Sequence, residues 1–457
     1  MNALASGKKS FIVSHQSIAS FIMLIYLLLY EWGIFEVFSN VFIYPIKMLL
    51  PFSLLLFSIK KKINNTYYNN FLIAFFIFII WSLFPSFYNL GPEETIEQWL
   101  KYFARFVFIV LAGNYLMVNQ NARLFLMKSI VLISVLSLIQ YVGVYFFKLT
   151  NLFSFSEVSM ARGTFYGPLG LLGEVGSVMN FGIGKIYRLH GFWFEPSMTS
   201  AFMFSSFFLS KCLFQIERKI IWKRVSYLCL VGGFLCFSNA GYLSIGMAMI
   251  FGLIINLFNS SESKIKTIFK LSLPVLIIFI AIFGRAYVAS NLIDIDIARA
   301  IVGVRGGSCA GTTCGGVDYS VDPSDGRLGS YSKLANIVNN YPLGIGIRTP
   351  GEKYDRKTGF TTDAGNAILG WAVYTGYIGI FLLFLRELQV LLFSLKNRKN
   401  NETFYLSQAW IVIFFQNMLY GTLMTPFYLL VIILIFSSNM NKWSLKLNQR
   451  TAIARLD

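Results

Sequence analysis

Apolar runs about as long as a lipid bilayer is thick recur along this chain, and they limit its possible folds more than any other feature. A transmembrane helix needs ~20 mostly apolar residues to cross a hydrocarbon core of ~30 Å. With 56% hydrophobic and only 13% charged residues among 457, a soluble multi-domain protein is excluded. We therefore expect an all-α polytopic membrane protein with about 12 transmembrane helices. These cover approximately residues 17–36, 38–59, 70–89, 102–118, 123–148, 196–212, 225–238, 241–258, 267–288, 366–385, 404–421 and 427–440.

The distribution of basic residues predicts which way these helices face. Short loops that are rich in Lys and Arg stay in the cytoplasm. If the N- and C-termini are both cytoplasmic, the cytoplasmic segments hold 23 Lys and Arg against 5 Asp and Glu, with Arg123, Arg386 and Glu387 among them. The difference equals the whole net charge of +18. The basic excess is then a consequence of topology, and nucleic-acid binding loses its main support.

Two long external loops, residues 149–195 and 289–365, interrupt what is otherwise a single membrane domain over residues 1–457. Long loops in a compact protein are usually functional. In the second loop, residues 327–340 are expected to form one amphipathic helix on the membrane surface.

The cysteines divide into two groups. Cys309 and Cys314 lie in the second loop, where an external compartment permits oxidation, so a small disulfide is favoured. A metal pair is the alternative, but no further Cys or nearby His supports it. Cys212, Cys229 and Cys236 lie in or beside predicted helices and are interpreted as small apolar residues.

The sequence lacks the residues that several common enzyme activities require. No Walker A sequence is present, two histidines cannot assemble a His/Glu zinc site, and no Gly-x-Ser-x-Gly elbow supports a catalytic serine. Arginines at the outer boundary remain, and Arg188, Arg327 and Arg348 are flanked by glycine or apolar residues rather than by other charges. Guanidinium groups bind phosphate oxygens bidentately, so these three are candidates for phosphate binding. The alternative is that they are interface anchors or partners of the loop's own carboxylates.

Three further side chains are candidates for proton transfer or for positioning an acceptor. Glu195 lies between Phe194 and Pro196 at the head of a predicted helix, where burial would raise its pKa. Asp363 has a similar position ahead of the tenth predicted helix. Either carboxylate can instead stabilise the helix dipole without any catalytic role. His190 is a candidate base or a polar loop residue beside an aromatic cluster.

Two stretches of the sequence resemble bacterial O-antigen and exopolysaccharide polymerases. Arg188-Leu189-His190-Gly191-Phe192-Trp193-Phe194-Glu195-Pro196 is similar to their Arg-x-x-Gly-aromatic-x-x-Glu-Pro signature. Asp325-Gly326-Arg327, Tyr341-Pro342-Leu343-Gly344-Ile345-Gly346 and Gly376-Tyr377-Ile378-Gly379 resemble the second-loop pattern of the O-antigen polymerase-ligase superfamily. The turn Ser238-Asn239-Ala240-Gly241 between two helices also fits.

The resemblance implies a metal-independent glycosyltransferase with no cofactor in the bacterial cytoplasmic (inner) membrane, with its active site facing the periplasm or exterior. Such a polymerase joins undecaprenyl-diphosphate-linked oligosaccharide repeat units into a surface polysaccharide, which is an O-antigen of lipopolysaccharide, a capsule or an exopolysaccharide. Its partners would be the lipid bilayer and the chain-length regulator and flippase of the same pathway. Arg188 and Arg327 match arginines that the family pattern assigns to the diphosphate. Glu195, Asp363 and His190 are the candidates for the base or for acceptor positioning.

One departure bears on the choice within the superfamily. Ligases carry a His-Asn pair at the start of the helix after the long loop, and the matching pair here is Gly365-Asn366. A polymerase is therefore favoured over a ligase, although the base is left unassigned. A lipid-linked oligosaccharide flippase is the alternative from another class, but such transporters commonly show similar halves, and no duplication is visible here.

Overall fold

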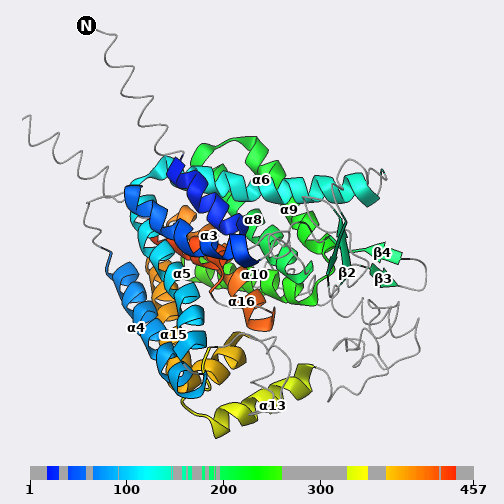
Figure 1. The fold of residues 1–457 in the computed structure, drawn as a ribbon. Coiled ribbons are helices and arrows are strands. Elements are labelled where there is room, and N and C mark those ends of the chain that lie inside the picture. Colours follow the sequence, from blue (N-terminus) through cyan, green and yellow to red (C-terminus); the bar gives the residue numbers. More distant parts are fainter. Residues whose placement is uncertain are drawn as a thin grey trace, which may run out of the picture.

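A computed structural model of the chain contains a bundle of helices with two small β-hairpins beside it (Figure 1). The structure describes residues 18–29, 40–57, 65–90, 92–145, 147, 157–160, 163–166, 178–180, 185–189, 191, 196–259, 327–347, 367–420 and 424–438. The helices are Ile18–Leu29, α3 (Asn40–Ser53) with the 3-10 turn η1 (Leu54–Phe57), α4 (Thr66–Leu90), α5 (Pro92–Val118), α6 (Gln120–Tyr145), α8 (Pro196–Glu217), α9 (Ile220–Leu235), α10 (Asn239–Asn259), α13 (Arg327–Asn340), α15 (Ala367–Lys396), α16 (Asn401–Tyr420) and α17 (Pro426–Ser437).

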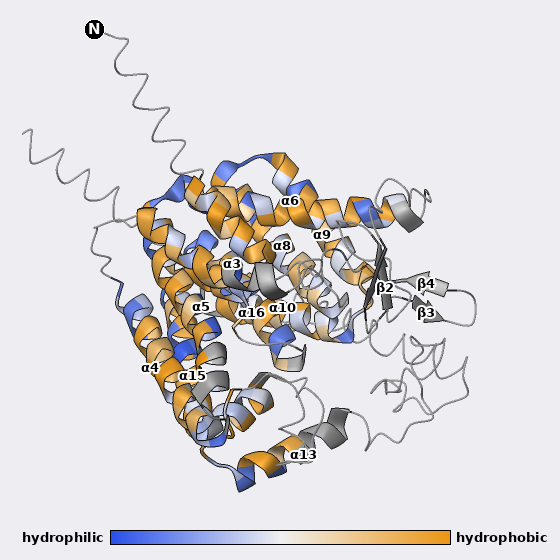
Figure 2. Cartoon of the chain, viewed as in Figure 1, coloured by the Kyte–Doolittle hydropathy of each residue, from blue (hydrophilic) through white to orange (hydrophobic). Residues whose placement is uncertain are grey.

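The chain is a helical membrane protein. Within the described ranges, five helices are long and apolar enough to cross a bilayer, and they lie in α4, α5, α6, α10 and α15. Ile18–Leu29, Ile46–Phe57 and Pro426–Ser437 are shorter apolar helices. Apolar residues dominate the helices, and hydrophilic residues gather toward several helix ends (Figure 2). Each predicted apolar run except 267–288, which lies outside the described residues, coincides at least in part with a helix.

α8 is the helix around which others pack, and its small polar residues explain why. Ser134 and Ser206 share a hydrogen bond of 2.7 Å between α6 and α8, and Ser205 donates to the carbonyl of Ala409 in α16. Ser200 donates to the carbonyl of Gly233 in α9. Small side chains allow helix backbones to approach closely within a membrane. The serine-rich sequence of α8 therefore suits contact with protein on several sides.

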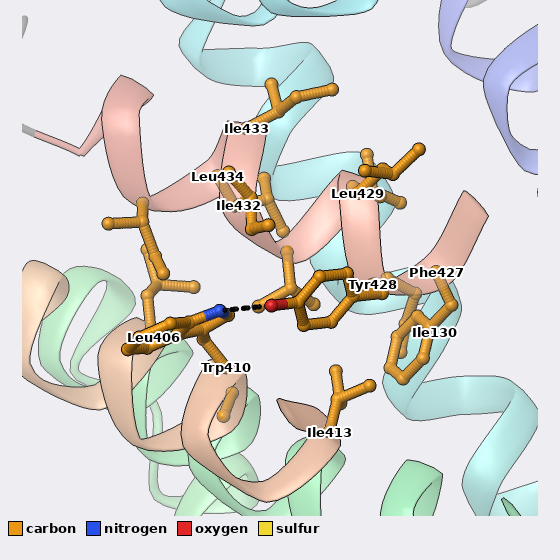
Figure 3. Packing of buried hydrophobic residues seen from close by; sticks show 14 of the residues in the cluster. Ile130, Leu406, Trp410, Ile413, Phe427, Tyr428, Leu429, Ile432, Ile433 and Leu434 are labelled. Atoms are coloured by element: carbon orange, nitrogen blue, oxygen red, sulfur yellow. Dashed lines mark hydrogen bonds between the residues drawn. The ribbon is translucent and has the colours of Figure 1, made fainter. Parts of the chain in front are cut away.

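α17 forms the centre of the apolar core, since every residue from Pro426 to Ser437 is buried. Its Tyr428 accepts a hydrogen bond of 3.0 Å from the indole of Trp410 in α16 (Figure 3). A helix that is apolar on all sides avoids water by facing lipid or protein, and here α5, α15 and α16 all pack against it. Thr425 caps its first turn by accepting from the backbone N–H of Tyr428.

A buried polar cluster joins the ends of four helices. Arg123, at the start of α6, is 1% exposed, donates to the carbonyl of Ser437 at the end of α17 and lies 3.1 Å from Glu402 at the start of α16. Asn65, before α4, donates to the carbonyl of Phe436. The alternation of the predicted helices assigns all of these ends to one face of the membrane. Arg123 was expected among the cytoplasmic cations, and the structure shows that its side chain is buried.

α15 differs from its prediction in length and in shape. The expected helix at 366–385 continues to Lys396, so Arg386 and Glu387 lie inside the helix rather than in the connection after it. Both side chains are buried, which the apolar run ending at residue 385 did not predict. Gly376 has non-helical torsion angles (φ 65°, ψ −168°) and breaks α15 into two parts.

The two predicted long loops contain regular structure. In residues 149–195, β1 (Glu157–Met160) pairs antiparallel with β2 (Gly163–Tyr166), and β3 (Val178–Asn180) with β4 (Lys185–Tyr187). These short hairpins are additions to a chain whose described part is otherwise helical. In the second loop, α13 spans the predicted residues 327–340, and its Leu334, Ile337 and Val338 pack against Ala372 and Val373 of α15. Its apolar face is thus covered by protein.

Candidate functional site

Arg188 follows β4, and its side chain hydrogen-bonds residues 149–195, the first long loop, to the end of α9. It is partly buried, and it donates from Nε to the carbonyl of Cys236 (3.0 Å) and from Nη2 to the carbonyl of Phe237 (3.2 Å). The last carbonyls of a helix have no partner within it, and a cation there also complements the helix dipole. Arg188 therefore has a structural role at this helix end.

Leu189 and Gly191, which follow Arg188 in the signature, extend this attachment. Leu189 is fully buried with Tyr141, Met203 and Cys236, and its N–H donates to the carbonyl of Leu235 (3.0 Å). Gly191 has φ 57°, and a Cβ on it would lie 2.8 Å from Oγ of Ser137 in α6. The Arg-x-x-Gly part of the predicted signature thus docks against α6 and α9 and requires glycine at its end.

The turn between α9 and α10 receives this segment. Phe237 has φ 45°, a left-handed conformation that is uncommon for a residue other than glycine. Oγ of Ser238 accepts from the N–H of Gly241, and a Cβ on Gly241 would overlap Ser200 of α8. The Ser238-Asn239-Ala240-Gly241 turn therefore brings the heads of α8 and α10 close together.

The three parts of the second-loop pattern form one connected unit. Arg327 begins α13, and Tyr341–Ile347 follows it along the break in α15. The N–H groups of Ile345 and Gly346 donate to the carbonyls of Val373 and Tyr374 at 2.9 Å, and the N–H of Tyr377 donates to the carbonyl of Pro342. The segment thereby satisfies backbone groups that the break at Gly376 would leave without helical partners.

α4 holds the same unit from its other side. Trp81 donates from its indole to the carbonyl of Thr375 (2.8 Å), and Oγ of Ser86 accepts from the N–H of Ile347 (2.9 Å). Gly344 has φ 90°, and a Cβ there would lie 2.5 Å from the carbonyl oxygen of Tyr374. Gly344 and Gly376 therefore face each other where the two backbones cross.

Most predicted site residues are not among those that the structure describes. His190, Glu195, Arg348 and Asp363 lie outside them, as do Cys309 and Cys314, so their proposed roles stay predictions. Arg327 is placed by its backbone at the first residue of α13. Cys212, Cys229 and Cys236 are buried and free, as their interpretation as small apolar residues predicts. The described residues contain no group of three His, Cys, Asp or Glu side chains suited to a metal ion.

A charged network that the sequence did not predict lies inside the bundle. Arg386 donates to Oε1 of Glu387, and the hydroxyl of Tyr428 donates to Oε2 of the same carboxylate. The guanidinium also lies 5.1 Å from the ring centre of Phe75. The adjacent Arg and Glu within an apolar stretch were the available signal, because ionisable residues at membrane depth are rare and costly unless paired.

A second buried charge pair has a different electrostatic character. Burial raises the pKa of Glu402 to about 7, although neighbouring Arg123 acts in the opposite direction. The 3.1 Å approach between the two side chains is not aligned as a hydrogen bond. By contrast, hydrogen bonds from Lys128 and then Trp222 lower the pKa of Glu217 at the exposed end of α8.

Comparison with protein family models, curated proteins and solved structures finds no match for this chain.

Proposed function

We propose that this protein polymerises lipid-linked oligosaccharide repeat units at the outer face of a bacterial cytoplasmic membrane. The substrate would be an undecaprenyl-diphosphate-linked oligosaccharide. The product would be an O-antigen, capsule or exopolysaccharide chain.

The proposal rests on how the helix bundle binds the two segments that resemble O-antigen and exopolysaccharide polymerases. Arg188 and Gly191 dock on α6 and α9, and Tyr341–Ile347 crosses α15 at Gly376. Neither segment is an independent surface loop, because each supplies backbone or side-chain partners to the ends or breaks of the helices. Rigid attachment of this kind is what a site needs in order to hold reacting groups in one geometry.

Helix-end contacts support the proposed sidedness. Arg123, Glu402 and Ser437 meet at ends that the positive-inside rule assigns to the cytoplasm. Arg188 meets Cys236, and Ile347 meets Ser86, at ends assigned to the exterior. With both termini cytoplasmic, the two long loops would face outward.

The proposed reaction moves the growing glycan from its lipid diphosphate to a new repeat unit. The bond between the anomeric carbon and a diphosphate oxygen breaks, and the hydroxyl oxygen of the acceptor sugar forms the new glycosidic bond. The hydroxyl proton passes to a base, for which Glu195, Asp363 and His190 are candidates. The departing diphosphate needs cationic stabilisation, which we assign to Arg188 and Arg327. Arg348 is a third candidate for this contact.

Genetic disruption separates the proposal from its alternatives. A polymerase mutant should display surface glycan of one repeat unit. Loss of all surface glycan would instead indicate a flippase, and long polymer that is never attached to its acceptor would indicate a ligase.

Point variants test the arginines within the same strain. Arg188→Ala and Arg327→Ala should abolish polymerisation while the protein remains in the membrane, and Lys should replace either one poorly because it lacks the bidentate fork. Arg224→Ala is the matched control, since Arg224 is an exposed cation of α9 far from both segments in the sequence. Normal chain length in both arginine variants would refute their assignment. Activity of the purified protein on a synthetic lipid-linked repeat unit should be unchanged by a chelator.

A further inference from the structure

Two buried amide side chains near the end of α16 lack hydrogen-bond partners. Gln416 is 2% exposed and Asn417 is 6% exposed. Nε2 and Oε1 of Gln416 and Nδ2 of Asn417 have no partner. Burying a polar amide without a partner is costly, so such groups are usually completed by a ligand or by water.

Gln408, two turns earlier on the same helix, shows what a satisfied glutamine looks like in this bundle. It is also buried, at 6% exposure, but its Nε2 donates to the carbonyl of Ala248 in α10 (3.2 Å). Gly252 allows this approach, since a Cβ there would overlap the amide. The missing partners of Gln416 are therefore a property of its position and not of glutamines in α16 generally.

The register of the helices locates Gln416. α8 and α16 run antiparallel, because Cys212 lies opposite Glu402 (3.9 Å) and Ser205 lies opposite Ala409 (3.3 Å). Each step of seven residues is about two turns on both helices. The next such step places Gln416 level with Met198, in the first turn of α8.

The same reasoning applies to α10. Gln408 lies opposite Ala248, so Gln416 is level with Ala240 at the head of α10. α8, α10 and α16 lie next to one another in the bundle (Figure 1). The unpartnered amides thus lie at the layer where α8 and α10 begin, and the carbonyls of Cys236 and Phe237 that Arg188 caps come four and three residues before Ala240.

We propose that Gln416 and Asn417 bind hydroxyl groups of the oligosaccharide carried by the lipid-linked substrate. This inference rests on the proposed function and assigns the sugar contact within the same outer layer. An amide can donate to one hydroxyl and accept from its neighbour, which suits adjacent hydroxyls on a sugar ring. Neutral amides also leave the recognition of the charged diphosphate to arginine. A site built to hydrogen-bond a hydroxyl discriminates strongly against analogues that lack it.

The first experiment measures thermal unfolding of the full-length protein in detergent without substrate. Gln416→Met keeps the volume and removes polar atoms that have no partner, so its melting temperature should equal or exceed that of the wild type. Gln408→Met removes a satisfied hydrogen bond and should melt at a lower temperature. A Gln416→Met protein that melts as low as the Gln408→Met protein would show that the Gln416 amide already has partners, and would overturn the inference.

The second experiment measures polymerisation by the same proteins. The substrate is the lipid-linked repeat unit extracted from cells that lack this gene. Loss of one neutral substrate hydrogen bond corresponds to about a tenfold change, so Gln416→Met should raise KM about tenfold with little change in kcat. Asn417→Leu should act in the same direction, and Gln408→Met should keep the wild-type KM. An unchanged KM in both outer variants would mean that the amides hold water only, and would refute the sugar contact.

A binding measurement distinguishes failure of this inference from failure of the proposed function. The lipid-linked repeat unit should raise the melting temperature of the wild type more than undecaprenyl diphosphate without sugar does. Gln416→Met should lose this difference while it keeps the response to the bare lipid. If the wild type binds the sugar-bearing lipid in this way but makes no polymer, the polymerase proposal fails and the contact stands. If both lipids raise the melting temperature of the wild type equally, the proposed sugar contact is refuted.

Discussion

Replacing Gly376 by alanine should release Tyr341–Ile347 from the break in α15. Gly376 has φ 65° and ψ −168°, a region that is essentially restricted to glycine and costs any other residue ~1–3 kcal/mol. A Cβ there would also overlap the carbonyl oxygen of Pro342 and lie 2.7 Å from the backbone nitrogen of Gly344. Both obstacles are backbone atoms, so no side-chain rotation can relieve them.

The magnitude follows from the contacts that would be lost. Displacing the segment breaks four hydrogen bonds, each with a net contribution of ~1 kcal/mol: Ile345 to Val373, Gly346 to Tyr374, Tyr377 to Pro342 and Ile347 to Ser86. With about 2 kcal/mol for the backbone conformation, the total is about 6 kcal/mol. Because the cost of global unfolding is larger than that of detaching one segment, we expect local opening.

Hydrogen exchange on the purified protein would detect this opening. The amides of Ile345 and Gly346 should lose protection in Gly376→Ala, and polymerisation should fall if the segment is part of the site. Gly232→Ala in α9 is the control, because a Cβ there would meet only the flexible side chain of Met203, whose Sδ would lie 3.0 Å away. Wild-type protection of both amides in Gly376→Ala would refute the argument that the crossing requires glycine.

Two further predictions concern the buried charges. Arg386→Met should destabilise the protein by ~3–5 kcal/mol because it leaves the Glu387 carboxylate buried without its cation, whereas Arg386→Met combined with Glu387→Leu should recover much of that loss in chemical unfolding. A double variant no more stable than the single one would show that the pair itself, and not the orphaned charge, matters. The pKa of Glu402 is raised from its ordinary value of 4.5 to about 7, so its contribution to stability is fully present below pH 4.5 and is lost as the pH rises through about 7. Glu402→Gln should therefore gain in melting temperature relative to the wild type between pH 5 and pH 8, and a relative loss would mean that the ion pair with Arg123 outweighs burial.

Helix positions were predictable because length and apolarity are local properties of the sequence. The run at 404–421 was expected within a few residues of α16, and the surface helix 327–340 coincides with α13. The burial of Arg386 and Glu387 was not predictable, since the charges ended an apolar run and resembled an ordinary cytoplasmic boundary. Only the packing of α4, α16 and α17 around α15 encloses them.

The candidate site was predictable in its motifs and not in its contacts. Arg188 stood out because it is flanked by apolar residues, but nothing local indicates that it caps α9 some 50 residues later. Gln416 and Asn417 carry no sequence signal, because amides in helices are common. Their lack of partners emerges only when the surrounding helices are in place.

The sequence by itself determined that this chain is a membrane protein, since enough apolar residues in succession leave no soluble alternative, and it located most of the helices. Tertiary structure decided which polar groups are satisfied. Whether an arginine caps a helix, pairs with a carboxylate or is left for a ligand depends on groups that are distant in the sequence. The packing of the bundle decides which of these groups come together. It does so through close contacts that no local pattern specifies, such as Gly344 against Gly376 and α8 against α16.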